Sequence, residues 1–221
     1  MRAVLAVAVA VCGSAVAVVA PASGQPADCP PVCDRIPDSA WIDTTAVPLD
    51  AVYHWPGLAG IAVTAPSPRF RFEDECVTPP VFADPRVYAV AARAAVPQPD
   101  GQWQLQTQVV HWRGETWRGG QDALSVLRTA SANLRACQLT APAASPSVTT
   151  DEPERLAAVV SIDGLRVLHQ YLVAHPRSSS VVELALWSAA PPLTDWPPVP
   201  DVQVFDAMIA PLCTAYIGSC P

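Results

Sequence analysis

The clearest alternation of apolar and polar positions lies in the middle of the chain. Residues 87–96 form a run with β-sheet propensity, and Pro99-Asp100-Gly101 supplies turn chemistry after it. The next residues alternate strictly, with Gln102, Gln104, Gln106 and Gln108 on one face and Trp103, Leu105, Thr107 and Val109 on the other. This pattern predicts a strand over residues 102–112 whose glutamine face is exposed to solvent and whose other face is buried.

Helical spacing replaces this alternation after a break at Gly119-Gly120. The apolar positions that recur at this spacing are Ala123, Val126, Leu127, Ala130, Leu134 and Cys137. Asp122 falls in the first turn and Arg135 in the last, where each complements the helix dipole. We therefore expect a helix that packs one apolar stripe on the sheet.

A three-strand meander is predicted next, after residues 139–153, whose Ala, Pro, Ser and Thr content predicts a mobile surface loop. Residues 156–162 and 165–175 are joined by Asp163-Gly164, a two-residue hairpin signal. Residues 181–187 return after a polar turn and complete the meander.

The last segment predicts a second amphipathic helix over residues 204–216, which Pro211 would split into two short pieces. It follows residues 190–200, where five prolines exclude regular structure. The order from Cys76 onward is β-β-α-β-β-β-α. This order predicts an α+β fold, an antiparallel sheet with helices packed on one face.

The N-terminal third divides into a leader and an irregular extension. Arg2 and the apolar residues 3–20 precede Ala20-Pro21-Ala22, so residues 1–22 are predicted to be a signal peptide cleaved after Ala22. The alternative is a retained membrane anchor, because the apolar run approaches the length of a bilayer span. Residues 23–68 are predicted to be a proline-rich extension, and residues 69–221 an α+β domain.

Cysteine usage indicates an oxidising compartment. Beyond Cys12 in the leader, six cysteines remain: Cys29, Cys33, Cys76, Cys137, Cys213 and Cys220. An even set in an exported chain predicts three structural disulfides and a secreted or otherwise extracytoplasmic location in the cell envelope. The Cys29-x3-Cys33 spacing fits neither a redox motif nor a zinc finger, so no metal or cofactor is expected.

The charge balance excludes nucleic acid as a partner. All 13 basic residues are arginine, and after removal of Arg2 the remaining 12 face 20 carboxylates, a net charge of about −8. Such a surface repels phosphate backbones. The absence of lysine also excludes a Walker-type nucleotide site. A membrane is expected as a partner only if the leader is retained.

Candidate acids, bases and metal ligands are few. The histidines are His54, His111, His169 and His175. His169 and His175 share a strand face but stand about 20 Å apart, whereas His111 could approach His169 across the sheet. A secreted hydrolase would use His111 or His169 with a carboxylate such as Asp163 or Glu183. No nucleophile elbow is present, which disfavours this alternative.

Two further clusters of residues are candidate binding surfaces. Trp112 falls on the glutamine face and Trp117 lies in a polar connection, so an exposed pair beside Arg113 and Arg118 could hold a sugar, a lipid or a protein. The favoured interpretation, however, is that these side chains cover a sheet edge. The run of three carboxylates at residues 73–75 matches no calcium loop and predicts a solvated acidic turn.

Several of these segments together resemble a known family. They are Asp74-Glu75-Cys76, Val87-Tyr88-Ala89-Val90, Val109-Val110-His111-Trp112, Asp122-Ala123-Leu124 and Leu134-Arg135-Ala136-Cys137. Over residues 76–216 the chain resembles the extracellular sensor domain of mycobacterial PknH-type serine/threonine kinases and its secreted or lipid-anchored relatives. The resemblance implies an α+β domain whose groove binds a ligand without catalysis. It also implies a disulfide between Cys76 and Cys137.

The chain departs from this family in two respects. It has no kinase domain, and it lacks the family's second bridge because no cysteine occurs between Cys137 and Cys213. We expect Cys29 and Cys33 to pair with Cys213 and Cys220; local Cys29–Cys33 and Cys213–Cys220 pairs are the alternative.

The predicted function is a secreted, non-catalytic domain that binds an envelope ligand or a protein partner. The alternatives are the hydrolase and a structural envelope protein held by an uncleaved leader.

Overall fold

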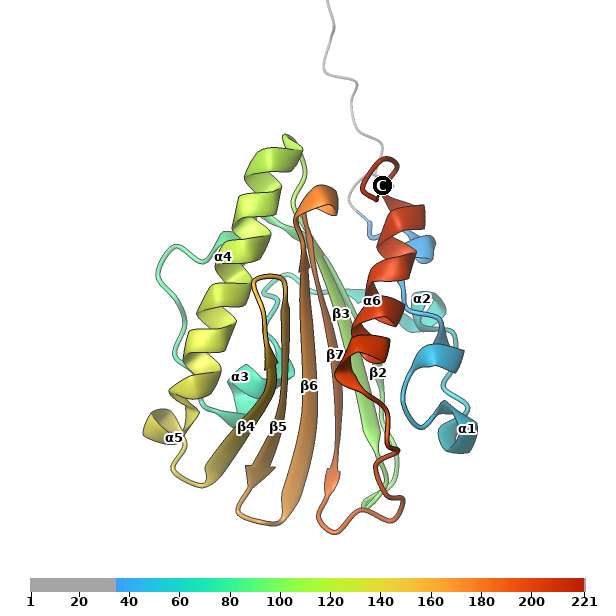
Figure 1. The fold of residues 1–221 in the computed structure, drawn as a ribbon, viewed down its shortest axis with the longest axis vertical. Helices are drawn as coiled ribbons and strands as arrows, with labels where there is room; N and C mark the ends of the chain where they lie inside the picture. The colour runs from blue at the N-terminus through green and yellow to red at the C-terminus, as the bar shows by residue number, and fades with distance from the viewer. Residues whose placement is uncertain (1–34, 221) are drawn as a thin grey trace, which may run out of the picture.

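A seven-stranded antiparallel sheet forms the centre of the protein (Figure 1). The structure, a computed structural model, describes residues 35–220. The strands follow the spatial order β1-β2-β3-β7-β6-β5-β4. Their bounds are β1 (Val63–Thr64), β2 (Val90–Val96), β3 (Gln104–His111), β4 (Ala144–Asp151), β5 (Arg155–Ile162), β6 (Arg166–His175) and β7 (Ser180–Ala189). The α+β class expected from the sequence is confirmed.

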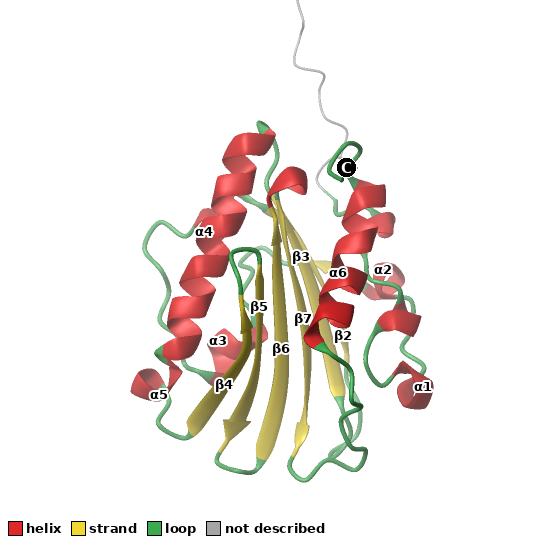
Figure 2. Cartoon of the chain, in the orientation of Figure 1, coloured by secondary structure: helices red, strands yellow, loops and turns green. Residues whose placement is uncertain are grey.

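Helices cover both faces of this sheet (Figure 2). The α-helices are α1 (Asp50–Tyr53), α2 (Leu58–Ile61), α3 (Arg71–Glu75), α4 (Thr116–Arg135), α5 (Cys137–Thr140) and α6 (Asp201–Ala215). The 3-10 helices are η2 (Asp38–Ala40), η3 (Thr44–Ala46), η4 (Pro85–Tyr88) and η5 (Pro176–Ser178).

The alternation along β7 shows why two layers of helix form. Val182, Leu184 and Leu186 pack with α6, while Val181 and Ala185 pack with α4. We call these two sides of the sheet the α6 face and the α4 face. The expectation of helices on one face is wrong, because central strands that are apolar on both faces need cover on both.

The glutamine face of β3 is buried, against expectation. Gln106 is 7% exposed and Gln108 is fully buried. The Gln106 amide donates to Glu183 Oε2 at 3.0 Å, and Gln108 Oε1 accepts from Arg93 Nε at 3.0 Å. Buried amides are tolerated where such partners satisfy them, and a strand pattern alone does not reveal the partners.

An additional strand, β4, replaces most of the predicted surface loop. Its residues alternate between exposed and more buried positions, and it pairs with β5 at the edge of the sheet. The prediction failed here because a segment rich in Ala, Pro, Ser and Thr has the composition of a loop. The order after Cys76 therefore contains four strands between α4 and α6 instead of three.

Both long helices differ from expectation near residues that usually disrupt helices. Helix α4 begins before Gly119 and Gly120, where a Cβ on Gly120 would lie 2.7 Å from the Pro176 carbonyl oxygen. The glycines therefore let α4 approach the turn between β6 and β7 closely. Helix α6 runs through Pro211 as a single helix.

The described part of the N-terminal extension belongs to the same core. Ile36, Trp41, Trp55 and Leu58 are buried with the α6 face of the sheet, and β1 pairs with β2. Within residues 35–220, no helix combines the length and apolar character needed to cross a membrane.

Candidate functional site

The predicted aromatic surface is only partly present. Trp112 is 5% exposed, and its indole N–H donates to the Pro85 carbonyl at 3.0 Å, so its expected exposure is wrong. Its position on the buried glutamine face explains this. Trp117 is 59% exposed, with the Arg118 guanidinium 5.4 Å from its ring centre. Arg113 is also exposed.

Two disulfides lie in the described chain. Cys76 bonds to Cys137, as the resemblance implied. Cys213 bonds to Cys220, so the expected pairing of these two with the N-terminal extension is wrong, and the local alternative holds for them. Because only seven residues separate the two cysteines, the bond joins the last turns of α6 to the segment directly after it. Cys12, Cys29, Cys33 and the predicted cleavage site at Ala22 lie outside the described residues.

Two of the histidines meet a serine at one end of the sheet. His111 on β3 lies opposite Ser180 on β7, and Ser180 lies opposite His175 on β6. Tyr216 stacks on the His111 ring at 4.3 Å between centroids. His175 Nε2 lies 3.9 Å from Cys220 Sγ.

Ser180 lies within hydrogen-bond distance of both a carbonyl and a histidine. Ser180 Oγ lies 2.9 Å from the Ser178 carbonyl oxygen, to which it can donate, and 3.0 Å from His111 Nδ1. When Ser180 donates to the carbonyl, His111 Nδ1 is the donor in the second contact. A general base would need to accept the serine proton instead. Burial lowers the pKa of both His111 and His175.

The residues proposed for a hydrolase do not converge. His169 stacks on Trp196 at 3.6 Å, and burial lowers the pKa of His169 to about 4. His111 aligns with His175, six residues along β6 from His169. Glu183 lies on the α4 face of the sheet, whereas His111 and His169 both lie on the α6 face. Asp163 lies in the β5–β6 turn.

His54 is exposed after α1. Among the described residues no group of three metal-ligating side chains occurs.

The expected solvated acidic turn is instead helix α3, whose carboxylates bind arginines. Glu73 is 2% exposed and accepts two hydrogen bonds from Arg86, at 2.7 and 2.9 Å. Glu75 binds both Arg71 and Arg166. The negative charges of Glu73 and Glu75 are therefore balanced by arginines of the same protein.

A groove of about 550 Å³ lies at the end of the sheet opposite the histidine row. The β2–β3 turn, the start of β6 and the end of β7 form it. Its lining residues are Gln98, Asp100, Gly101, Gln102, Gln104, Leu165, Arg166, Trp187, Ser188 and Ala189. We call it the Trp187 groove, because Trp187 is its aromatic side chain. The ring is half-buried, and its N–H has no hydrogen-bond partner among residues 35–220.

Charged and amide side chains hold the walls of this groove. The Arg71 guanidinium lies 4.3 Å from the Trp187 ring centre, and Glu75 bridges Arg71 to Arg166. Gln104 donates to the Gln98 carbonyl at 2.7 Å and accepts from the Gln98 N–H at 2.8 Å. These contacts fix the positions of the side chains around the groove.

A buried carboxylate anchors the helix that supports the groove. Glu183 is fully buried and accepts hydrogen bonds from the Arg71 N–H and from the amides of Gln106 and Gln170. Gln170 also accepts from the Phe72 N–H at 3.1 Å. Burial raises the pKa of Glu183 to about 7, although these donors oppose the shift.

Sequence reasoning missed this groove because its residues come from three distant segments. The predicted strand ended at Trp187, and the Asp163-Gly164 turn sets the register that places Arg166 opposite Ala189. Combining the two hairpin registers would have brought Trp187 and Arg166 to the same end of the sheet. Comparison with known proteins finds no matching family model, no matching curated protein and no matching solved structure.

Proposed function

We propose that the protein is a secreted, extracytoplasmic binding module that holds an envelope ligand in the Trp187 groove without transforming it. The observation that carries this proposal is a half-buried indole, with an unpaired N–H, lining an open groove beside Arg166. An aromatic ring with convergent polar groups is the usual composition of a ligand site.

The disulfides, the family resemblance and the positions of the histidines also support this proposal. Two disulfides indicate an oxidising environment, which is typical of extracytoplasmic proteins. The resemblance to PknH-type sensor domains, which bind rather than catalyse, favours the same role. The scattered positions of His111, His169 and Glu183 favour binding over the hydrolase alternative.

The chemistry of the groove favours a saccharide. The indole offers apolar contact and an N–H donor, Arg166 offers a planar set of donors, and Gln98 offers both a donor and an acceptor. Sugar rings combine an apolar face with hydroxyls that donate and accept hydrogen bonds, so they match this mixture. Arg166 and Asp100 at the rim allow neutral and charged sugars to be distinguished.

Calorimetric titration of the secreted protein with neutral and acidic oligosaccharides tests the proposal. At least one class is expected to bind, and Trp187→Ala is expected to weaken binding about tenfold or more, as loss of an aromatic anchor does. Trp117→Ala is the matched control and is expected to bind normally, since Trp117 lies at the other end of the sheet. If Trp117→Ala abolishes binding and Trp187→Ala does not, the ligand binds elsewhere.

A further inference from the structure

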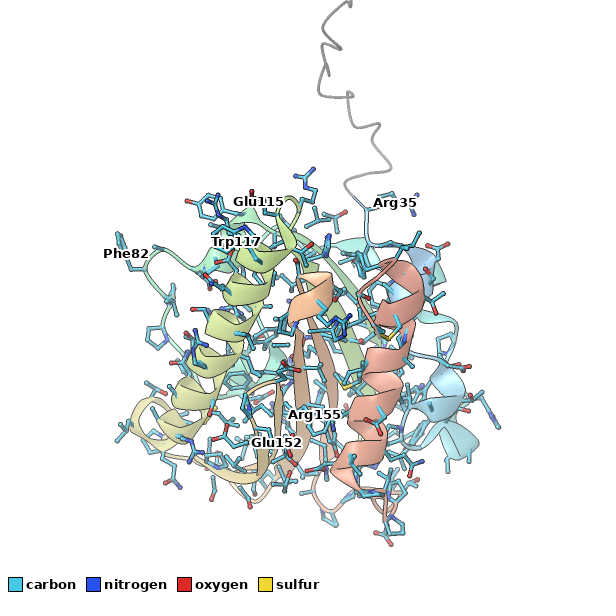
Figure 3. The ribbon with its side chains drawn as sticks, turned by 45° about the horizontal axis from the view of Figure 1, so that its top comes forward. Arg35, Phe82, Glu115, Trp117, Glu152 and Arg155 are labelled. Atoms are coloured by element: carbon cyan, nitrogen blue, oxygen red, sulfur yellow. A yellow bond between two sulfur atoms is a disulfide. The ribbon has the colours of Figure 1, made fainter. Side chains whose placement is uncertain are left out.

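The end of the sheet opposite the Trp187 groove carries a second surface. At this end Val90, His111, Ser180 and His175 are aligned across four strands. The described chain also begins here, and Figure 3 shows Arg35, Glu115 and Trp117 at this end. We call it the Arg35 end.

Large apolar side chains project into solvent at the Arg35 end. Tyr88 is 80% exposed, Trp117 is 59% exposed and Ile217 is fully exposed. They come from η4, the first turn of α4 and the segment after α6, so three separate parts of the chain place apolar groups around one end. Apolar groups gathered in this way mark a surface that meets something less polar than water.

The same end is basic, although the protein is acidic. Arg113, Arg118 and Arg177 are exposed there, as is Arg35, while the exposed carboxylates near them are Glu115 and Asp38, which lines a pocket together with Arg35. Arg118 and Arg177 form no salt bridge with any described residue. Most other arginines, such as Arg86 and Arg166, are bound to carboxylates.

Further acidic residues lie close to this end of the sheet. Glu152 and Glu154 lie in the β4–β5 turn, where the Glu154 carbonyl accepts from the Ala174 N–H. The protein therefore has a positive end on an otherwise negative surface.

We propose that the Arg35 end docks on the surface of a lipid bilayer with anionic headgroups. Tryptophan and tyrosine favour the membrane–water interface, and arginine near an anionic leaflet is attracted to it. A surface that combines both has the composition of a peripheral membrane-binding face. A protein partner would not require this combination of interfacial aromatics with Arg118 and Arg177, which form no salt bridge to described residues.

The chain that precedes Arg35 agrees with this orientation. Residues 21–34 separate the apolar run at residues 3–20 from Arg35. Those 14 residues can span at most about 50 Å. A retained leader would hold the Arg35 end near the bilayer, and after cleavage the exposed aromatics and arginines still provide the contact. The Trp187 groove, at the other end of ten-residue strands, then faces away from the membrane.

Co-sedimentation of the leader-free protein with vesicles tests the proposal. Binding is expected to vesicles of phosphatidylcholine mixed with phosphatidylglycerol, to fall with added salt, and to be weak with phosphatidylcholine alone. Arg118→Glu combined with Arg177→Glu is expected to weaken binding at least about tenfold, and Trp117→Ala severalfold.

Matched controls separate the surface from general charge and hydrophobicity. Arg128→Glu changes an exposed arginine midway along α4, and Leu139→Ser removes a leucine that is 85% exposed in α5. Both are expected to bind vesicles as the unchanged protein does. The proposal is overturned if the anionic vesicles bind no protein at low salt, or if the controls lose binding as much as the Arg118 and Arg177 variant. A dimer that Trp117→Ala dissociates, without vesicle binding, would assign the surface to a second copy instead.

Discussion

Single ionisable side chains are buried on both faces of the sheet and respond to pH in opposite directions. Glu183 lies on the α4 face with its pKa raised to about 7 by burial, and His169 lies on the α6 face with its pKa lowered to about 4. Folding therefore favours the neutral form of each. The carboxylate has the larger structural role, because it binds the first N–H of α3, and Arg71 of α3 packs on Trp187.

Glu183→Gln tests the buried carboxylate. Because its pKa is higher in the folded protein than in the unfolded chain, its stabilising contribution is complete below about pH 4.5 and is lost as pH rises through about 7. The loss amounts to about 3 kcal/mol. Chemical denaturation across this range should show the variant gaining stability relative to the unchanged protein as pH rises. A difference that is constant with pH would contradict the assignment.

The elements differ in how readily the sequence reveals them. The β5–β6–β7 meander follows from alternation and the Asp163-Gly164 turn, because both signals are local. Strand β4 could not be recognised, since its short polar side chains and Pro146 resemble a loop and its pairing with β5 supplies the order. Gly119 and Gly120 resemble a helix break, but their function is close packing against the β6–β7 turn.

Gly120→Ala measures this close approach. The new Cβ would lie 2.7 Å from the Pro176 carbonyl oxygen, so α4 or the turn must shift, at a cost of about 1–3 kcal/mol in unfolding free energy. Gly60→Ala in α2 is the control: nothing lies within 4 Å of its Cβ, and no loss of stability is expected. Thermal denaturation compares the two, and equal melting temperatures would argue against tight packing at Gly120.

The two described disulfides should contribute unequally. The Cys76–Cys137 bond closes a separation of 61 residues and the Cys213–Cys220 bond one of seven, which predicts losses of about 4 and about 2 kcal/mol when each pair is changed to alanine. Denaturant titration of the two double variants gives the comparison. A larger loss of stability in the Cys213 and Cys220 variant would contradict this estimate and would mean that the bond also stabilises structure outside the loop it closes.

At the scale of the whole molecule, the hydrophobic core includes residues that precede residue 69, where the sequence predicted the domain to begin. Residues 36–58 place Trp41 and Trp55 against the α6 face, where the sheet would otherwise be exposed beside α6. The prolines of this segment obscured its short helices. The candidate site was equally hard to foresee: Trp117 and Arg118 were found exposed as expected, but the Trp187 groove depends on the registers of separate hairpins.

A truncation that begins at Arg69 tests the extent of the core. It removes the cover over part of the α6 face and the pairing partner of β2, so it is expected to lose cooperative unfolding. A chain that begins at Arg35 is expected to keep it. Near-ultraviolet circular dichroism during denaturation distinguishes the two, and a cooperative transition in the shorter chain would show that residues 69–221 form an independent domain.

The two edge strands of the sheet also affect whether copies of this protein can pair edge to edge. Strand β1 has two residues, and β4 carries Pro146 and a register shift between Val148 and Thr150. A proline has no N–H to offer a neighbouring strand, and an irregular edge cannot template a continuous ladder. Both described borders of the sheet are therefore poor seeds for edge-to-edge aggregation between copies of this protein.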